Sequence, residues 1–190
     1  YILKRKSAET SYPVAIVAQA EERFKKYSAK ELENLAWIVM FGLPGEKMNT
    51  VEDLHEKLEW YKDIDTNALR ENLCYFQKEI SEVALECGVK LAIHPDDPPF
   101  PILGLPRVVS SREDFEYFLN KVDNDANGLC FCTGSLGASP KNDLPAMVKE
   151  FGNKIHFAHL RNVAKDKEGN FFEADHLGGD TDMYAVVKEL

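Results

Sequence analysis

The sequence predicts an α/β fold in which parallel strands alternate with helices, as in an incomplete (β/α)8 TIM barrel. Short apolar segments of strand-like composition follow amphipathic helical segments, and each of them ends on a histidine or a cysteine. Strands that alternate with helical segments indicate βαβ units and a parallel sheet. A closed barrel typically needs about 250 residues, and this sequence has 190. We therefore expect residues 1–190 to form a single domain that is part of a barrel, without its N-terminal strands and its C-terminal strand or strands.

The first half of the sequence predicts three helices after an irregular, polar N-terminal stretch. Helical spacing of apolar residues predicts one helix over 28–41, with a stop at 42–45. Thr50 and Asp53 form a capping-box pattern for a second helix, which ends near Asp63. A third helix runs from Thr66 to Gly88. We expect its apolar stripe to face the core: Leu69, Leu73, Phe76, Ile80, Val83, Ala84 and Cys87.

The second half predicts strands over 89–93, 129–132 and 155–160, with helices between them. Ser111 with Asp114 caps the first of these helices, and Asn142 or Asp143 caps the second. A further helix begins at Asp182. The order of helix, turn and strand is therefore repeated along this half of the chain.

Composition and charge indicate a globular protein that acts on a small molecule. Hydrophobic residues make up 44% of the sequence, enough for a substantial core. The formal net charge of -9, without a basic stripe, argues against a nucleic-acid partner, because phosphate binding depends on Lys and Arg. No apolar run approaches the roughly 18 residues of a membrane span, and the first residues lack the apolar segment of a signal peptide. We expect no membrane partner, a cytoplasmic location and a homo-oligomer.

Three residues of the types that bind metals stand at the ends of the predicted strands: His94, Cys132 and His159. Parallel α/β barrels build their sites from strand ends at one rim, so these side chains should converge. Two imidazoles and a thiolate suit a transition metal such as Mn, Fe, Co or Zn better than Mg or Ca. Taken singly, each residue could instead be a polar group satisfied within the fold or, for the cysteine, a small packing residue.

Other polar residues have less distinctive positions. His156 and Cys130 lie deeper in the same strands and are interpreted as packing residues, and His55 as a solvated residue on a charged helix face. The paired acids of the loop 94–99 could hold the imidazole of His94. The candidate groups on the substrate side are Arg161, the hydroxyl of Ser135 in a glycine-rich turn, Tyr184, and His176 in a flexible loop as a catalytic residue.

The ordered motifs HPDDPP, GLPR, CTGSLGA, NDL and HLRNV, followed by a DMY segment, closely resemble the mannonate dehydratase family. The resemblance implies a TIM-barrel lyase that converts D-mannonate to 2-keto-3-deoxy-D-gluconate in hexuronate (glucuronate) breakdown, with Mn or Fe as cofactor. It also implies that His94, Cys132 and His159 are the metal ligands. The family's remaining ligand is an Asp in an Arg-Pro-Asp-His-Gly segment, whose His is a candidate main base. The given sequence contains no such segment, so both groups are expected beyond Leu190.

The residues leave two other functions open. A metal-dependent TIM-barrel sugar isomerase or epimerase would share a metal at the rim, but such sites usually prefer carboxylates, which makes Cys132 unexpected. A non-catalytic module could use the same three residues in a structural zinc site. The number of protein ligands separates these cases, because structural zinc has four and a catalytic metal keeps an open position.

Overall fold

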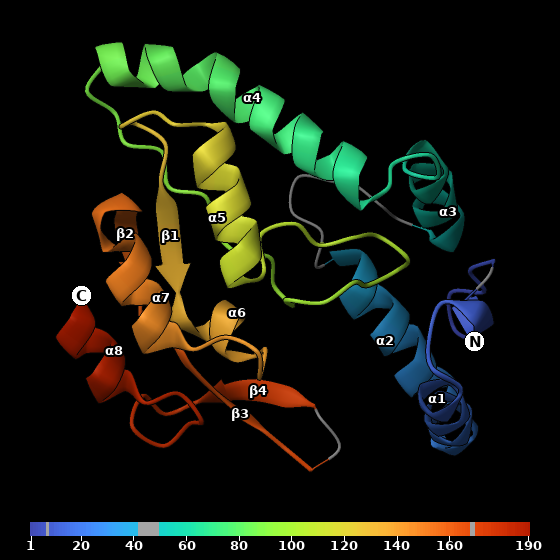
Figure 1. The fold of residues 1–190 in the computed structure, drawn as a ribbon. Coiled ribbons are helices and arrows are strands. Elements are labelled where there is room, and N and C mark those ends of the chain that lie inside the picture. Colours follow the sequence, from blue (N-terminus) through green and yellow to red (C-terminus); the bar gives the residue numbers. More distant parts are fainter. Residues whose placement is uncertain (7, 42–49, 168–169) are drawn as a thin grey trace. The chain divides into compact units, whose positions relative to one another are not determined.

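The computed structural model describes residues 1–6, 8–41, 50–167 and 170–190. The chain divides into two compact units (Figure 1). Unit 1 comprises residues 1–64 and 103–105, and unit 2 comprises residues 65–102 and 106–190. A single domain over residues 1–190 stays a prediction. Among the helices of the described ranges, none has both the length and the apolar content that crossing a membrane requires.

Unit 1 is helical, and one of its helices was not expected. Its elements are η1 (Ala8–Thr10), α1 (Val14–Lys26), α2 (Ala29–Phe41) and α3 (Val51–Trp60). The expectation of an irregular N-terminal stretch is wrong, because α1 occupies about half of it. The residue before α1 is Pro13, which makes no side-chain cap hydrogen bond, so the usual start signal is missing. The predicted stop at 42–45 lies outside the described residues.

The small core of unit 1 forms around Leu54 of α3. This side chain is 1% exposed, and the partly buried residues packed against its cluster are Leu3, Ala36, Val51, Leu58 and Leu103. The predicted capping box is confirmed: the Asp53 amide donates to Thr50 Oγ1 at 3.1 Å, and the Thr50 amide donates to Asp53 Oδ2 at 3.0 Å. Local capping therefore fixes the start of the helix that carries this core.

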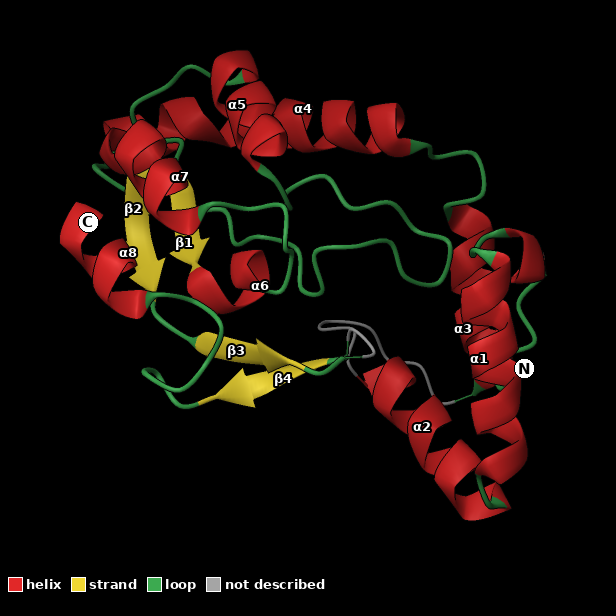
Figure 2. Ribbon diagram, turned by 60° about the horizontal axis from the view of Figure 1, so that its bottom comes forward, coloured by secondary structure: helices red, strands yellow, loops and turns green. Residues whose placement is uncertain are grey.

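Unit 2 contains helices and two separate pairs of strands (Figure 2). Its elements are α4 (Thr66–Glu86), α5 (Arg112–Lys121), β1 (Leu129–Cys132), α6 (Thr133–Gly137), α7 (Leu144–Phe151), η2 (Gly152–Lys154), β2 (Ile155–His159), β3 (Asn162–Lys165), β4 (Phe171–Ala174) and α8 (Met183–Glu189). The predicted caps Ser111 and Asp143 are confirmed, and Asp182, at which a helix was expected to begin, caps α8; each side chain accepts a backbone N–H of the first helical turn. The antiparallel pair β3–β4 was not predicted.

The parallel pairing of β1 with β2 confirms the expected strand direction. In the ladder Cys130 faces Phe157 and Cys132 faces His159, so the two strands end level with each other. All four residues of β1 are buried. The described part of the chain thus has a mixed α/β fold with a partial parallel sheet.

The segment 89–93 differs from the predicted strand. It runs beside β1 and exchanges ladder-like hydrogen bonds with it: Ile93 N donates to Gly128 O at 3.0 Å, and Cys130 N donates to Ile93 O at 2.8 Å. Its one bridge joins Ile93 to Leu129 in the parallel sense. Pairing cannot continue beyond His94, because Pro95 has no backbone N–H to donate. This segment still delivers His94 to the end of β1 at which Cys132 lies.

The main core of unit 2 packs helices against β1. Its largest fully buried side chains include Phe115, Phe118, Phe131, Leu136 and Met147. Phe115 of α5 meets Phe151 of α7 edge to face, with ring centroids 5.8 Å apart. This packing supports the buried strand from which the site is built.

The predicted apolar stripe of α4 is only partly correct. Phe76 and Val83 are 56% and 60% exposed, while the buried residues of the helix are Cys74, Gln77, Ser81 and Ala84. Polar contacts decide which face meets α5: Arg70 pairs with Asp114, and the Tyr117 hydroxyl donates to Glu71. The spacing of apolar residues along α4 does not show how ion pairs with α5 rotate the helix about its axis.

We expect Asp114→Ala to lower the free energy of unfolding by about 3 kcal/mol. The carboxylate accepts the amides of Ser110 and Ser111 at the start of α5 and is the partner of Arg70, so its removal leaves several groups unsatisfied. Urea denaturation of the variant measures the loss. The control is Asp123→Ala at an exposed position, which should change stability by less than about 0.5 kcal/mol. Equal losses in both variants would contradict this account.

Candidate metal centre

The three predicted ligands converge in unit 2. The candidate ligand atoms of His94, Cys132 and His159 all lie within 4.8 Å of one another. Cys132 is buried, whereas both histidines are exposed, so the group is open on one side. Within the described residues it is the one group of three or more such side chains close enough to hold an ion.

The sheet brings these side chains together. Cys132 and His159 are the last residues of β1 and β2 and face each other in the parallel ladder, which leaves Cys132 Sγ 3.5 Å from His159 Nδ1. His94 directly follows Ile93, the residue that bridges to β1. Its ring lies 5.9 Å from the ring of His159, centroid to centroid, at 53°. Three segments far apart in the sequence thus end at one point.

The hydrogen bond of His94 fixes which ring nitrogen can bind a metal. Its Nδ1 lies 2.7 Å from the carbonyl oxygen of Pro95. A carbonyl oxygen only accepts, so Nδ1 carries the proton and the lone pair is on Nε2. Metal-binding histidines commonly use this arrangement, in which the second nitrogen donates to a carbonyl or a carboxylate.

The donor set fits a divalent transition metal. Bonds from such ions to N and S are about 2.0 to 2.3 Å long, so two ligands of one ion stand about 3 to 4.5 Å apart. The limit of 4.8 Å between the candidate ligand atoms is within a few tenths of an ångström of this range. The thiol favours Mn, Fe, Co or Zn over the hard ions Mg and Ca. These residues therefore suit the metal that the sequence predicted.

The paired acids after His94 have other partners than expected. Asp96 Oδ2 accepts the amides of Val108 and Val109, each at 2.8 Å, and thereby holds the loop in place. Asp97 Oδ2 accepts a hydrogen bond from Arg161 Nη2 at 2.6 Å and lies 3.2 Å from Ser135 Oγ. The expectation that these carboxylates hold the His94 imidazole is wrong, because the carbonyl of Pro95 does so.

The turn after Cys132 is built around Arg161. Thr133 Oγ1 accepts the Arg161 amide at 2.8 Å and donates to the Arg161 carbonyl at 2.6 Å. Ser135 is fully buried, and its Oγ lies 3.3 Å from Cys132 Sγ. Burial alone would lower the pKa of the Arg161 guanidinium, but its hydrogen bond and ion pair with Asp97 outweigh this effect and raise the pKa above its ordinary value. The guanidinium is thus held as a cation beside the candidate ligands.

Gly134 leaves the space in which the guanidinium of Arg161 lies close to the turn after Cys132. A Cβ atom at this position would lie 2.1 Å from Arg161 Nε and 2.8 Å from its Cζ. Arg161 Nε is itself buried without a hydrogen-bond partner. Only a residue without a side chain lets the guanidinium lie this close to the turn.

His176 lies in a loop that Asn162 holds. The buried amide of Asn162 donates to the carbonyls of His176 and Thr181 at 2.7 and 3.0 Å. His176 Nε2 lies 2.9 Å from the carbonyl of Leu160, the residue after His159. Asn162 was not predicted as a functional residue, and the sequence signal for it is its place in the HLRNV motif.

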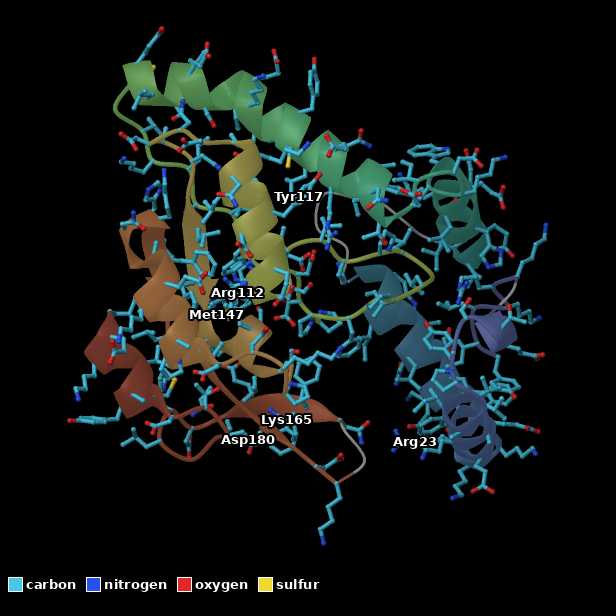
Figure 3. The ribbon with its side chains drawn as sticks, viewed as in Figure 1. Arg23, Arg112, Tyr117, Met147, Lys165 and Asp180 are labelled. Carbon is cyan, nitrogen blue, oxygen red and sulfur yellow. The ribbon has the colours of Figure 1, made fainter. Side chains whose placement is uncertain are left out.

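A second contact restrains the same loop. Lys165 of β3 pairs with Asp180 at 3.2 Å (Figure 3) and donates to the Gly137 carbonyl of α6 at 2.9 Å. Tyr184 lies on α8 and is 75% exposed. The roles of Arg161, Ser135, Tyr184 and His176 toward a substrate stay predictions.

The remaining candidate residues have structural surroundings. His156 Nδ1 lies 2.7 Å from the Leu91 carbonyl, in agreement with its interpretation as a packing residue. Cys130 is buried, and burial together with the nearby Cys132 raises the pKa of its thiol. His55 is half-buried rather than solvated, since its Nε2 lies 2.5 Å from the Leu3 carbonyl.

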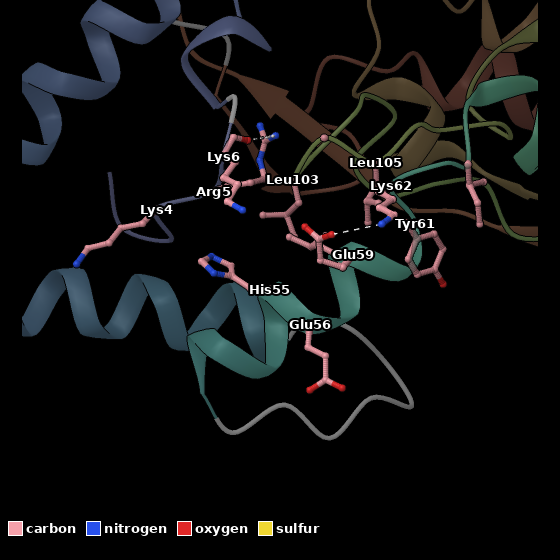
Figure 4. Close-up of a pocket in the computed structure, with 13 residues that line it drawn as sticks. Lys4, Arg5, Lys6, His55, Glu56, Glu59, Tyr61, Lys62, Leu103 and Leu105 are labelled. Carbon is pink, nitrogen blue, oxygen red and sulfur yellow. Dashed lines mark hydrogen bonds and ion pairs between the residues drawn. The ribbon is translucent and has the colours of Figure 1, made fainter.

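His55 lines a hollow of unit 1 with a volume of about 650 Å³ (Figure 4). The walls of this hollow are of mixed charge, with Arg5 and Lys62 beside Glu56 and Glu59. Such a lining gathers neither a set of metal ligands nor a charge of one sign. The chemistry suited to a metal therefore lies in unit 2.

Comparisons with known proteins show which family this chain is similar to. Residues 9–190 match the model of a family described as D-mannonate dehydratase (UxuA). The mannonate dehydratase of a Marinomonas species is 47% identical over 192 residues, covering 100% of this chain and 49% of the relative. Mannonate dehydratase 2 of Agrobacterium fabrum is 46% identical over 191 residues, covering 48% of that relative. The chain thus spans about half the length of these curated relatives.

A solved structure also resembles this chain. The crystal structure of mannonate dehydratase from Streptococcus suis serotype 2 superposes with a TM-score of 0.69 at 43% sequence identity. The match covers 77% of this chain and 43% of that one.

We expect Gly134→Ala to lower the free energy of unfolding by about 1 to 3 kcal/mol, because the added methyl group displaces Arg161. Thermal or urea unfolding measures the change. Gly152→Ala is the matched control, since no atom lies within 4 Å of its added Cβ and its φ of -50° suits alanine. That variant should be neutral or slightly more stable. Similar losses in both variants would contradict the tight contact at Gly134.

Proposed function

Since the chain belongs to the D-mannonate dehydratase family, we propose that the full-length protein is a hydro-lyase that converts D-mannonate to 2-keto-3-deoxy-D-gluconate and water. The observation that best supports this proposal is the convergence of two imidazoles and a thiol at the ends of neighbouring segments of a parallel sheet. The proposal includes the hexuronate (glucuronate) pathway, a TIM barrel with this site at its C-terminal rim, a cytoplasmic location and a homo-oligomer. These finer points rest on the sequence resemblance and on composition.

In this proposal His94, Cys132 and His159 hold Mn²⁺ or Fe²⁺. When bound, such an ion supplies positive charge that stabilises negative charge developing on substrate oxygens. The open side of the group argues for a catalytic site over a closed structural one, and the sulfur ligand argues against an isomerase site, which usually prefers carboxylates. A structural zinc module and a sugar isomerase are the alternatives that the experiments below must exclude.

Dehydration of a sugar acid requires two difficult events. A base must take the proton from C2, beside the carboxylate, and an acid must protonate the hydroxyl that leaves C3 as water. The product is an enol, which tautomerises to the 2-keto acid. No atom is lost besides the water, so the reaction needs no oxidant or reductant.

The substrate-side groups follow from the surroundings of the candidate ligands. The guanidinium of Arg161 is a cation that Asp97 holds in place near Cys132. It is suited to bind the carboxylate of the substrate, which is an anion at neutral pH. His176 bonds the carbonyl next to His159 and is exposed, which suits a group that exchanges protons with a substrate. Tyr184 is exposed, and its hydroxyl is assigned to substrate binding. The hydroxyl of Ser135 is buried beside Cys132.

We expect full-length protein loaded with Mn²⁺ or Fe²⁺ to form a keto acid from D-mannonate, as measured by carbonyl derivatisation. Cys132→Ser and His159→Ala should lose metal affinity and turnover by more than about 100-fold, because each removes a direct ligand. Cys87→Ser replaces an exposed cysteine outside the site and should retain both. Full turnover in the metal-depleted ligand variants would overturn the proposal.

We expect His176→Ala to lower kcat on D-mannonate by about 10² to 10⁴, the usual contribution of a proton-transfer group, while bound metal is unchanged. Tyr184→Phe should instead raise KM, with a smaller effect on kcat. Steady-state kinetics combined with metal analysis separates the two roles. Tyr75→Phe, at an exposed position of α4, is the control for loss of a hydroxyl. A kcat of His176→Ala equal to that of the unmodified protein would remove this residue from the chemistry.

A further inference from the structure

We propose that Ser135 is a positioning residue for the metal ligand Cys132, whose sulfur receives a hydrogen bond from the Ser135 hydroxyl. This inference rests on the proposed function, because it takes Cys132 to be a ligand. It assigns Ser135 to the sulfur instead of to a substrate. The reasons lie in the short segment from Cys132 to Ser135 and in its contacts with Arg161 and Asp97.

The local backbone brings the two side chains together. Cys132 is the N-cap of helix α6 and Ser135 is its third helical residue, and the side chains at these two positions meet at the start of a helix. Ser135 Oγ is 3.3 Å from Cys132 Sγ, and both residues are 0% exposed. Water therefore has no access to this contact, and a buried sulfur depends on protein groups for its hydrogen bonds.

The Ser135 hydroxyl has one proton and two acceptors within reach. The acceptors are Cys132 Sγ at 3.3 Å and Asp97 Oδ2 at 3.2 Å. Asp97 already has a charged donor, since Arg161 Nη2 lies 2.6 Å from the same oxygen. Arg161 Nη2 also lies 3.5 Å from Ser135 Oγ and can donate a hydrogen bond to it, because a hydroxyl oxygen accepts hydrogen bonds as well as donating one. Because Arg161 already donates to Asp97, the hydroxyl proton of Ser135 is available to Cys132 Sγ.

The other neighbour of the sulfur does not serve as its donor in the proposed site. Among the described residues, the side chains within hydrogen-bond distance of Cys132 Sγ are Ser135 and His159. A histidine nitrogen that binds a metal uses its lone pair and carries no proton. If the nitrogen of His159 nearest the sulfur is a ligand, the hydroxyl of Ser135 is the one remaining side-chain donor in the described part of the chain. A thiolate is also a stronger acceptor than a thiol, so metal binding strengthens this contact.

The residues between Cys132 and Ser135 keep this arrangement rigid. Thr133 binds both backbone groups of Arg161, and Gly134 provides the space in which the guanidinium lies. Each residue of the Cys-Thr-Gly-Ser turn thus has a separate role in one network. The network restrains the side-chain torsion of Cys132 and removes part of the negative charge from its sulfur.

Two consequences can be measured without substrate. Loss of the hydrogen bond should weaken metal binding by about 10- to 100-fold, the usual effect of removing a partner of a ligand. It should also raise the energy of the sulfur lone pairs. The sulfur-to-metal charge-transfer absorption of the Co²⁺-loaded protein should then move to longer wavelength.

The test uses full-length Ser135→Ala loaded with Co²⁺, with affinity measured by competition against a chelator. We expect Ser135→Ala to bind Co²⁺ more weakly and its charge-transfer band to lie at longer wavelength. Ser135→Thr keeps the hydroxyl and should restore both properties toward those of the unmodified protein. Ser139→Ala, a serine outside this network, is the control. An unchanged affinity and an unchanged absorption band in folded Ser135→Ala would overturn the proposal.

A second variant keeps the inference testable if Ser135→Ala does not fold. Asp97→Ala removes the second acceptor, so the hydroxyl should keep its hydrogen bond to the sulfur and the band should stay in place or move to shorter wavelength. A shift to longer wavelength in Asp97→Ala would overturn the proposal. These readouts are independent of turnover. Protein that shows the expected shifts but leaves D-mannonate unchanged refutes the proposed function alone, and active protein without the shifts refutes the role of Ser135 alone.

Discussion

The parallel pairing of β1 with β2 is the contact on which the rest of the site depends. It sets Cys132 level with His159 at the ends of the two strands. Side chains alternate between the faces of a strand, so a slip of one residue would turn one of the two away from the other. The hydrogen bonds between Ile93 and the residues around Cys130 add the third segment to the same edge. Backbone register, more than any side-chain contact, therefore brings the candidate ligands together.

Polar side chains then hold the segments that follow the strands. Asp96 binds the amides of Val108 and Val109, Thr133 binds both backbone groups of Arg161, and Asn162 binds the loop that carries His176. Each of these contacts satisfies backbone groups that would otherwise lack partners near the sheet. Loops held this way keep side chains in fixed positions, as a metal site requires. The polar residues around the three candidate ligands are thus mainly a supporting framework.

The same physics explains which elements could be predicted. Capping residues act on amides within the same turn, so Thr50, Ser111, Asp143 and Asp182 marked the starts of helices correctly. Helix α1 has no side-chain cap, and the prediction missed it. The exposed face of α4 was misjudged because a contact with Asp114, 44 residues away along the chain, fixes the rotation of the helix. Predictions failed where distant contacts outweighed local pattern.

The sequence by itself determined the chemical types of the three ligands, the order of the segments that carry them and the resemblance of their motifs to one family. Only the tertiary structure decided which groups surround them: that the Pro95 carbonyl orients His94, that Asp97 binds Arg161, and that Ser135 lies against Cys132. The physical reason is the range of the forces involved. Capping and periodicity act within a few residues, whereas the contact of Asp97 with Arg161 joins residues 64 apart that only the folded chain brings within hydrogen-bond distance. The contacts of His94 with Pro95 and of Cys132 with Ser135 are local, but they depend on the backbone conformation at the strand ends, which neither pattern fixes.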